Sequence, residues 1–331
     1  MTVQALTTAL LAGRGFAHKR DISDAMAVLQ RSRPAASAVR VGDDCAAIPD
    51  GDGYLLFAME GFVDDFVQAM PWFAGYCGVM VNVSDIYAMG GRPLAVVDAI
   101  WSAGAAGSGA VLEGMAEASS RYGVPVVGGH TNHRSSRSQL AVAILGRAKR
   151  LLTSFDARPG QRLRMAIELR GAYQEPNPYW DASTMAPAER LRADLELLPA
   201  LAEEGLCGAG KDISMAGAIG TALMLLECSR VGAVIDVHAI PRPDGVPLLR
   251  WLQSFPSFGF VLSVDAANAA AVCQRFHARG VACADVGPVT QDPQVWLQEG
   301  QDRALLWNVA EQPFIQAPQA APSNVSEPAH A

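Results

Sequence analysis

The stretch VNVSDIYAMGG, residues 81–91, decides how the rest of the chain is interpreted. Apolar and small residues recur through 72–89 at helical spacing, and the closing glycine pair ends the helix that this pattern predicts. Asp85 lies inside this apolar helix, where a carboxylate needs a partner or a metal ion. Asn82 lies three residues earlier and so shares its face. The sequence therefore predicts a functional carboxylate on a buried helix.

Strands and helices alternate on both sides of this helix. On the N-terminal side of residue 150 we expect helices at 1–13, 20–32 and 109–122, strands at 54–59, 95–101, 124–127 and 139–145, and a loop at 128–138. Beyond residue 150 we expect helices at 213–229, 245–253 and 266–278, and strands at 233–237, 258–264 and 281–287. This alternation predicts an α+β fold made of two α/β layered domains.

The domain limits follow from where the pattern restarts. We expect an N-terminal helical, glycine-containing segment at 1–36, an N-terminal domain at 37–150 and a C-terminal domain at 151–300. The aromatic and Pro-rich residues 171–200 form an insertion that we expect to help choose the substrate. Residues 316–331 lack an apolar period and are expected to be disordered.

Composition excludes several classes of protein. The 331 residues are 50% hydrophobic and carry a net charge of −7, which argues against nucleic acid or an anionic membrane as the partner. No apolar run reaches the length of a membrane span. Six cysteines are scattered without a CxxC pair, which favours reduced thiols in a cytoplasmic protein.

Acidic residues recur beside predicted strand or helix ends. Asp43 and Asp44 follow Gly42, Glu60 follows the strand at 54–59, and Lys211-Asp212 opens the helix predicted at 213–229. Carboxylates in such positions suit Mg²⁺, which takes oxygen ligands and often bridges substrate phosphates. Taken singly, each motif has a simpler explanation as a solvated turn, a strand end or a helix N-cap.

Two further segments contain candidate residues for contact with phosphate. Gly128-Gly129-His130-Thr131 follows a predicted strand, and its glycines allow a ligand to approach the backbone. His130 is a candidate proton carrier or phosphate donor, or a hydrogen-bonded loop residue. Lys19 ends a short basic segment and is a candidate for a terminal phosphate, or an ordinary residue of a flexible basic N-terminus.

Together these motifs resemble the aminoimidazole-ribonucleotide-synthetase-like superfamily, which includes thiamine-monophosphate kinase and selenophosphate synthetase. The resemblance spans roughly residues 37–298 and is most specific in VNVSDIYAMGGRPL. It implies an N-terminal mixed-sheet dimerisation domain, a C-terminal α/β domain, a homodimer formed by the N-terminal sheets, and ATP between the domains. His130 and Met215 stand where the kinase has acidic residues, and Glu60 stands where it has an Asp.

By this resemblance we predict an ATP- and Mg²⁺-dependent enzyme that transfers a phosphoryl group to an oxygen of a small-molecule metabolite. The predicted catalytic residues are Lys19, Asp85 and His130. The predicted ATP-binding residues are Asp43, Asp44, Asn82, Asp85, Gly128, Gly129, Thr131 and Lys211. The predicted metal ligands are Asp43, Asp44, Glu60, Asp85 and Asp212.

Two alternatives stay open at this point. The first is a nucleotide-binding regulatory or partner subunit without turnover, motivated by the replaced acids at His130 and Met215. The second is a dikinase like selenophosphate synthetase, although the segment GRGFAHK at 13–19 lacks the cysteine that this enzyme uses.

Overall fold

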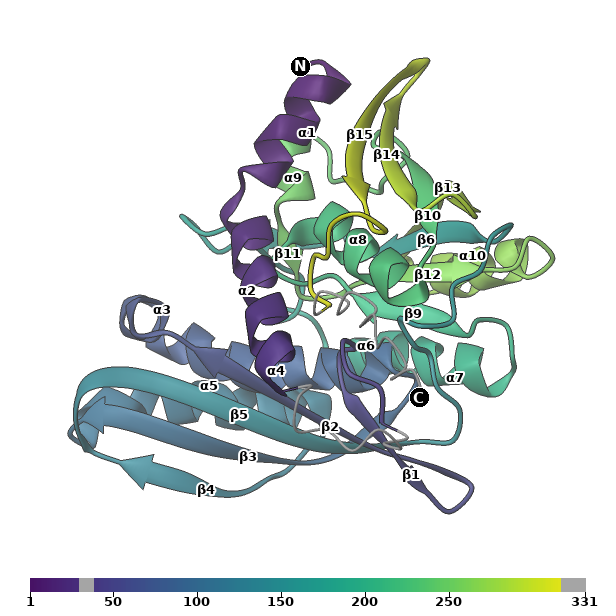
Figure 1. Ribbon diagram of the computed structural model, residues 1–331. Helices are drawn as coiled ribbons and strands as arrows, with labels where there is room; N and C mark the ends of the chain where they lie inside the picture. Colours follow the sequence, from purple (N-terminus) through teal and green to yellow (C-terminus); the bar gives the residue numbers. More distant parts are fainter. Residues whose placement is uncertain (30–38, 317–331) are drawn as a thin grey trace, which may run out of the picture.

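Helix α4 (Pro71–Ala88) lies between the two main sheets of the protein, as Figure 1 shows. It contacts strands β2 (Gly53–Phe62) and β5 (Arg134–Ala148) on one side and β9 (Ala209–Asp212) on the other. This position explains why almost every side chain from 73 to 88 is buried. The computed structural model describes residues 1–29 and 39–316, so nearly all of the tail predicted at 316–331 lies outside the described residues.

The N-terminal sheet has the strand order β1-β2-β5-β3-β4. Strands β3 and β4 run parallel, and the other neighbours are antiparallel, so the sheet is mixed. Helix α5 packs beside α4. The remaining elements of this part are β1 (Ala46–Asp50), α3 (Asp64–Ala69), β3 (Arg92–Ala103), α5 (Ala106–Tyr122) and β4 (Val126–Asn132).

The two faces of this sheet have different surroundings. Along β2, Leu56 and Ala58 are buried beneath the helices, whereas Phe57 and Met59 on the opposite face are 50% and 64% exposed. Figure 1 shows helices α3, α4 and α5 on one side of the sheet and none of the labelled helices on the other. The sheet therefore presents an apolar face that its own described residues do not cover.

Glycines allow α4 and α5 to pack closely. A Cβ at Gly75 would lie 1.9 Å from the carbonyl oxygen of Val111, and a Cβ at Gly114 would lie 1.9 Å from that of Trp72. Gly78 similarly lets α4 approach β5, because a Cβ there would lie 2.8 Å from Val142 Cγ2. These contacts fix the position of α4.

The C-terminal sheet has seven strands in the order β15-β14-β10-β13-β6-β12-β9. Its other strands are β6 (Arg162–Ile167), β10 (Gly232–Asp236), β12 (Gly259–Val264), β13 (Ala282–Thr290), β14 (Gln294–Glu299) and β15 (Asp302–Asn308). The helices of this part are α6 (Ala188–Leu195), α7 (Leu197–Glu203), α8 (Gly217–Ser229), α9 (Leu248–Leu252) and α10 (Ala269–Ala278). A separate small sheet contains β7 (Ala172–Tyr173), β8 (Tyr179–Asp181) and β11 (Phe255–Pro256).

The N-terminal segment forms α1 (Val3–Leu11) and α2 (Arg14–Leu29). The sequence offers a flexible basic segment as one interpretation of residues 13–19. In the structure these residues are mostly helical, because α2 begins at Arg14. Helix α2 packs against the C-terminal part, where a Cβ at Gly15 would lie 2.1 Å from the carbonyl oxygen of Met215. Phe16 is buried and packs against Phe314, with ring centroids 5.3 Å apart.

The predicted fold class is confirmed, since both parts are layered α/β units built on a sheet. Two local predictions are wrong. Residues 128–138, predicted as a loop, lie almost entirely in strands: 128–132 belong to β4 and pair with β3, and 134–138 begin β5. Gly129 makes room for Asp98, whose Oδ1 a Cβ would approach to 2.2 Å. Asp212 does not cap a helix: it ends β9 opposite Phe260, and α8 begins only at Gly217.

None of the helices within 1–29 and 39–316 combines the length and the apolar character that a membrane crossing requires.

Candidate metal centre

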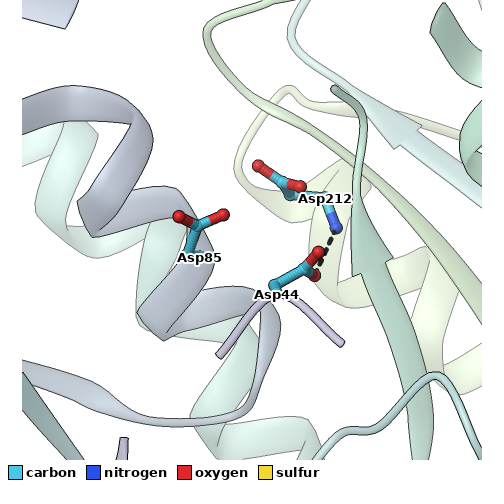
Figure 2. Close-up of side chains that lie close together, drawn as sticks. All are labelled: Asp44, Asp85 and Asp212. Carbon is cyan, nitrogen blue, oxygen red and sulfur yellow. Dashed lines mark hydrogen bonds between the residues drawn. The ribbon is translucent and has the colours of Figure 1, made fainter. Parts of the chain in front are cut away.

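Three carboxylates from distant parts of the chain meet between the two sheets. Asp44, Asp85 and Asp212 each place one oxygen so that the three atoms lie within 4.8 Å of one another. Figure 2 shows Asp85 projecting from its helix toward the other two side chains. Asp85 and Asp212 are 7% and 4% exposed. Three of the five predicted metal ligands therefore share one buried site.

Each of these carboxylates is positioned by a different element. Asp85 lies near the end of α4, Asp44 precedes β1, and Asp212 is the last residue of β9. The backbone N–H of Asp212 donates a hydrogen bond of 3.2 Å to Asp44 Oδ2, drawn in Figure 2. Lys211 forms a buried ion pair with Asp44 Oδ1, and both side chains are 5% exposed. These two contacts tie the segment before β1 to β9.

Asp43 is held by the start of the C-terminal part instead. The backbone N–H and the hydroxyl of Ser154 donate hydrogen bonds of 2.8 and 2.6 Å to its two carboxylate oxygens. The adjacent acids Asp43 and Asp44 thus have different partners. Asp43 orients the segment, while Asp44 belongs to the carboxylate cluster itself.

Burial and mutual repulsion change the acid–base properties of the cluster. Burial raises the pKa of Asp85 well above its ordinary value, and the charges of Asp212, Glu60 and Asp44 raise it further. Burial and Asp44 likewise raise the pKa of Asp212 to about 8. Burial also raises the pKa of Asp43 to about 6. In the absence of a cation, burial of these carboxyl groups therefore lowers the free energy of unfolding.

Glu60 and Lys19 lie at the border of the cluster. Glu60 shares the helix-covered face of β2 with Leu56 and Ala58 and keeps exposed surface. Desolvation of its carboxyl group raises its pKa, Lys19 opposes this rise, and Asp44 adds to it. Lys19 also lowers the pKa of Asp212. The charge of Lys19 on α2 therefore acts on both acids, and its contact with phosphate stays a prediction.

The donor set fits a hard divalent cation. Asp44, Asp85 and Asp212, with Glu60 at their border, supply only oxygen atoms, and Lys211 and Lys19 oppose these four carboxyl groups. Within the described residues, the buried Oδ1 of Asn82 also has no hydrogen-bond partner, while its Nδ2 donates to Gly78 O at 2.8 Å. Excess negative charge and a spare amide oxygen one turn from Asp85 suit Mg²⁺.

The predicted phosphate segment 128–131 lies elsewhere. Gly128, Gly129, His130 and Thr131 are exposed residues of β4, the edge strand, and β3 and β5 separate them from β2. His130 lies beside Trp101, with ring centroids 6.2 Å apart. The fold of one chain thus does not bring these residues to the carboxylate cluster, and their role stays a prediction.

Two domain families match the chain in the order of its two parts. The N-terminal domain of AIR synthase related proteins matches residues 42–148, and the C-terminal domain matches residues 166–298. This chain belongs to the AIR synthase related protein family. All three carboxylates of the cluster lie within the matched residues.

Several AIR synthase related proteins resemble this chain. An uncharacterized protein of Synechocystis is 49% identical over 302 residues, covering 91% of this chain and 94% of that protein. Thiamine-monophosphate kinase of Pyrococcus horikoshii is 32% identical over 140 residues, covering 39% and 43%. Thermotoga maritima PurL complexed with ATP has a TM-score of 0.70 and 20% identity over 84% of this chain. That match covers 47% of PurL, so this chain spans about half its length.

Sequence reasoning missed some residues of this AIR synthase related site. Ser154 fixes Asp43, and Cys45 is buried beside the cluster, where burial and Asp85 raise its pKa. Ser154 lies in LTSFD, between the two parts of the chain. A serine in a linker does not by itself indicate a hydrogen bond to a distant carboxylate. Cys45 directly follows the acidic pair and was interpreted only as a core thiol.

Proposed function

We propose that this protein transfers a phosphoryl group from ATP to an oxygen of a small-molecule metabolite at the Asp44–Asp85–Asp212 cluster. The observation that carries the proposal is the convergence of three carboxylates from three segments in a buried position between the domains. A structural role alone does not account for this arrangement, because uncompensated buried carboxylates destabilise a fold. Kinship to a kinase supports the same reaction class.

The proposed cofactors are ATP and Mg²⁺. Asp44, Asp85 and Asp212 would hold Mg²⁺, with Asp43 and Glu60 beside them. Mg²⁺ held there would supply positive charge that neutralises the charge developing during transfer.

The basic residues have separate tasks in this proposal. Lys211 balances the negative charge of Asp44 and fixes its orientation through the buried ion pair. Lys19 on α2 lowers the pKa of Asp212, and we assign it to a terminal phosphate as a point charge. Asp85, held on the packed helix α4, would fix the position of the metal ion relative to the other carboxylates.

We further propose a homodimer in which the apolar faces of two N-terminal sheets pair. Phe57, Met59, Val97 and Leu145 expose apolar surface on this face, which a second copy would bury. The segment Gly128–Thr131 lies on the edge strand of the same sheet, away from the carboxylates of its own chain. In a dimer these residues are available to the nucleotide of the second copy, and we assign them there.

An assay of ATP turnover tests the proposal. Purified protein is incubated with Mg·ATP and a metabolite mixture, and nucleotides are separated; ADP that appears with the wild type and not with Asp85→Asn supports phosphoryl transfer. Binding of ATP without ADP under any mixture supports the subunit without turnover. Release of AMP supports a dikinase. Absence of both binding and turnover contradicts the proposal.

A further inference from the structure

Two cysteines of the C-terminal part lie close enough to react with each other. Cys273 is on α10 and Cys283 is on β13, and their sulfur atoms are 3.4 Å apart. A disulfide bond has a sulfur–sulfur distance of about 2.05 Å, so each sulfur has to move by less than about 1 Å to form one. Cys273 is half-buried, whereas Cys283 is buried. An incoming reagent therefore reaches Cys273 first.

The surroundings of Cys273 favour its thiolate. Arg164 Nη1 lies 3.7 Å from Cys273 Sγ, and Nη2 of the same guanidinium lies 3.0 Å from Asp285 Oδ2. The Arg164 side chain is only 13% exposed, so solvent screens its charge weakly. Thiolates are the reactive form of cysteine, and neighbouring arginine stabilises them. The hydrogen bond with Cys283, followed by Arg164 and His277, lowers the pKa of Cys273.

The other cysteines lack this combination. Cys45, Cys77 and Cys207 are buried, and burial raises the pKa of each. Cys228 is half-buried like Cys273, but burial raises its pKa to about 12, and its thiol lies 3.4 Å from the carbonyl oxygen of Gly42. Cys228 is therefore a comparison thiol that is also partly exposed but lacks the nearby thiol and guanidinium.

We propose that Cys273 and Cys283 form a reversible disulfide in which Cys273 is the attacking thiol and Cys283 the resolving thiol. The oxidant is a low-molecular-weight disulfide. The Cys273 thiolate attacks one sulfur of this disulfide, a mixed disulfide forms, and one thiolate leaves. Cys283 then loses its proton to solvent and attacks Cys273 Sγ, which expels the second thiolate. Two protein thiols are oxidised, and one disulfide is reduced to two thiols.

The first step prepares the second. The hydrogen bond with Cys273 is the first cause that raises the pKa of Cys283, and the negative charge of Cys273 contributes as well. In the mixed disulfide, Cys273 Sγ no longer carries a negative charge and no longer forms this thiol–thiolate hydrogen bond. Both contributions to the raised pKa of Cys283 are therefore lost when the first step is complete. The resolving thiol thus becomes easier to ionise only after its target has formed. The bond would join α10 to β13, outside the carboxylate cluster and independent of its proposed function.

The test uses the full-length protein and glutathione disulfide. Native protein is incubated near neutral pH, unreacted thiols are blocked with iodoacetamide, and peptides are analysed by mass spectrometry without reduction. We expect a Cys273–Cys283 cross-link in the wild type and in Cys228→Ser, and its reversal by dithiothreitol. We expect a stable glutathione adduct on Cys273 in Cys283→Ser and no adduct at Cys283 in Cys273→Ser.

The rates decide between this assignment and general surface reactivity. The modification of Cys273 in Cys283→Ser is expected to be at least about tenfold faster than that of Cys228 in the same sample. Equal rates, or a wild type without the cross-link, would overturn the proposal. Circular dichroism of each variant checks that the fold is retained, and Cys273→Ala and Cys283→Ala replace any serine variant that does not fold.

Discussion

The ammonium group of Lys211 forms a buried ion pair with the carboxylate of Asp44. Burial alone would lower the pKa of this lysine, but Asp44 and Asp43 outweigh burial and raise it. Lys211 is therefore a permanent cation inside an otherwise acidic cluster. The pair also joins the segment before β1 to the end of β9, and so links the two parts of the chain.

Replacing Lys211 by Met is expected to destabilise the protein strongly. The change leaves Asp44 buried without its cation, which typically costs about 3–5 kcal/mol in the free energy of unfolding. Urea unfolding in EDTA measures the effect. The exposed Lys149→Met variant is the control and is expected to stay within about 0.5 kcal/mol of the wild type. Equal stability of the two variants would show that Lys211 does not compensate the cluster.

Asp85→Asn is expected to separate stability from function. The substitution keeps the shape of the side chain and removes a carboxyl group that burial and its acidic neighbours keep from ionising. The folded metal-free protein no longer bears this cost, so the Tm in EDTA should rise. The increase in Tm that Mg·ATP gives the wild type should be lost. Differential scanning fluorimetry measures both, with the exposed Asp52→Asn as the control. A lower Tm in EDTA for Asp85→Asn would argue against repulsion within the cluster.

The stability of the metal-free protein should depend on pH in a definite direction. Burial raises the pKa of Asp212 to about 8 and that of Asp43 to about 6, from an ordinary value of 3.8. Between about pH 4 and pH 8 the folded chain therefore binds more protons than the unfolded chain, and its free energy of unfolding falls as the pH rises. We expect Tm in EDTA to decrease across this window and less steeply in Asp212→Asn. Identical slopes would contradict the shift at Asp212.

The open face of the N-terminal sheet predicts the effect of a single surface charge. Met59 is 64% exposed on this face, and Met59→Lys would place an ammonium group in the proposed dimer interface. Light scattering coupled to size exclusion should give a dimer for the wild type and a monomer for Met59→Lys. The exposed Met185→Lys variant, 93% exposed and outside this sheet, should remain a dimer. A monomeric wild type would refute the proposed interface.

The local sequence predicted the elements better than it predicted their pairing. The apolar residues of 72–89 predicted α4 within one residue at each end. The prediction succeeded because nearly every side chain of this helix is buried, so apolar residues fill its whole length. The glycines and polar residues of 128–132 were interpreted as a loop, since only the neighbouring strand β3 supplies the pairing that makes them β4. Likewise, Asp212 resembled a helix cap in sequence but ends a strand held by β12.

The candidate site shows the same limit. Asp85 stood out because an acid inside an apolar helix has to be explained locally. Its convergence with Asp44 and Asp212 depends on the packing of α4 between two sheets, which spacing along the chain does not reveal. Lys211 was assigned to the nucleotide, and its buried ion pair with Asp44 became evident only in three dimensions.

Calorimetric titration of ATP tests the central claim most directly, because it asks whether the carboxylate cluster binds the nucleotide through a metal ion. Wild type and Asp85→Asn are each titrated with ATP in Mg²⁺ and in EDTA. We predict binding by the wild type in Mg²⁺, and affinity lower by roughly 100-fold or more both in EDTA and in Asp85→Asn. Equal affinity of wild type and Asp85→Asn in Mg²⁺, or binding that EDTA leaves unchanged, would contradict the claim.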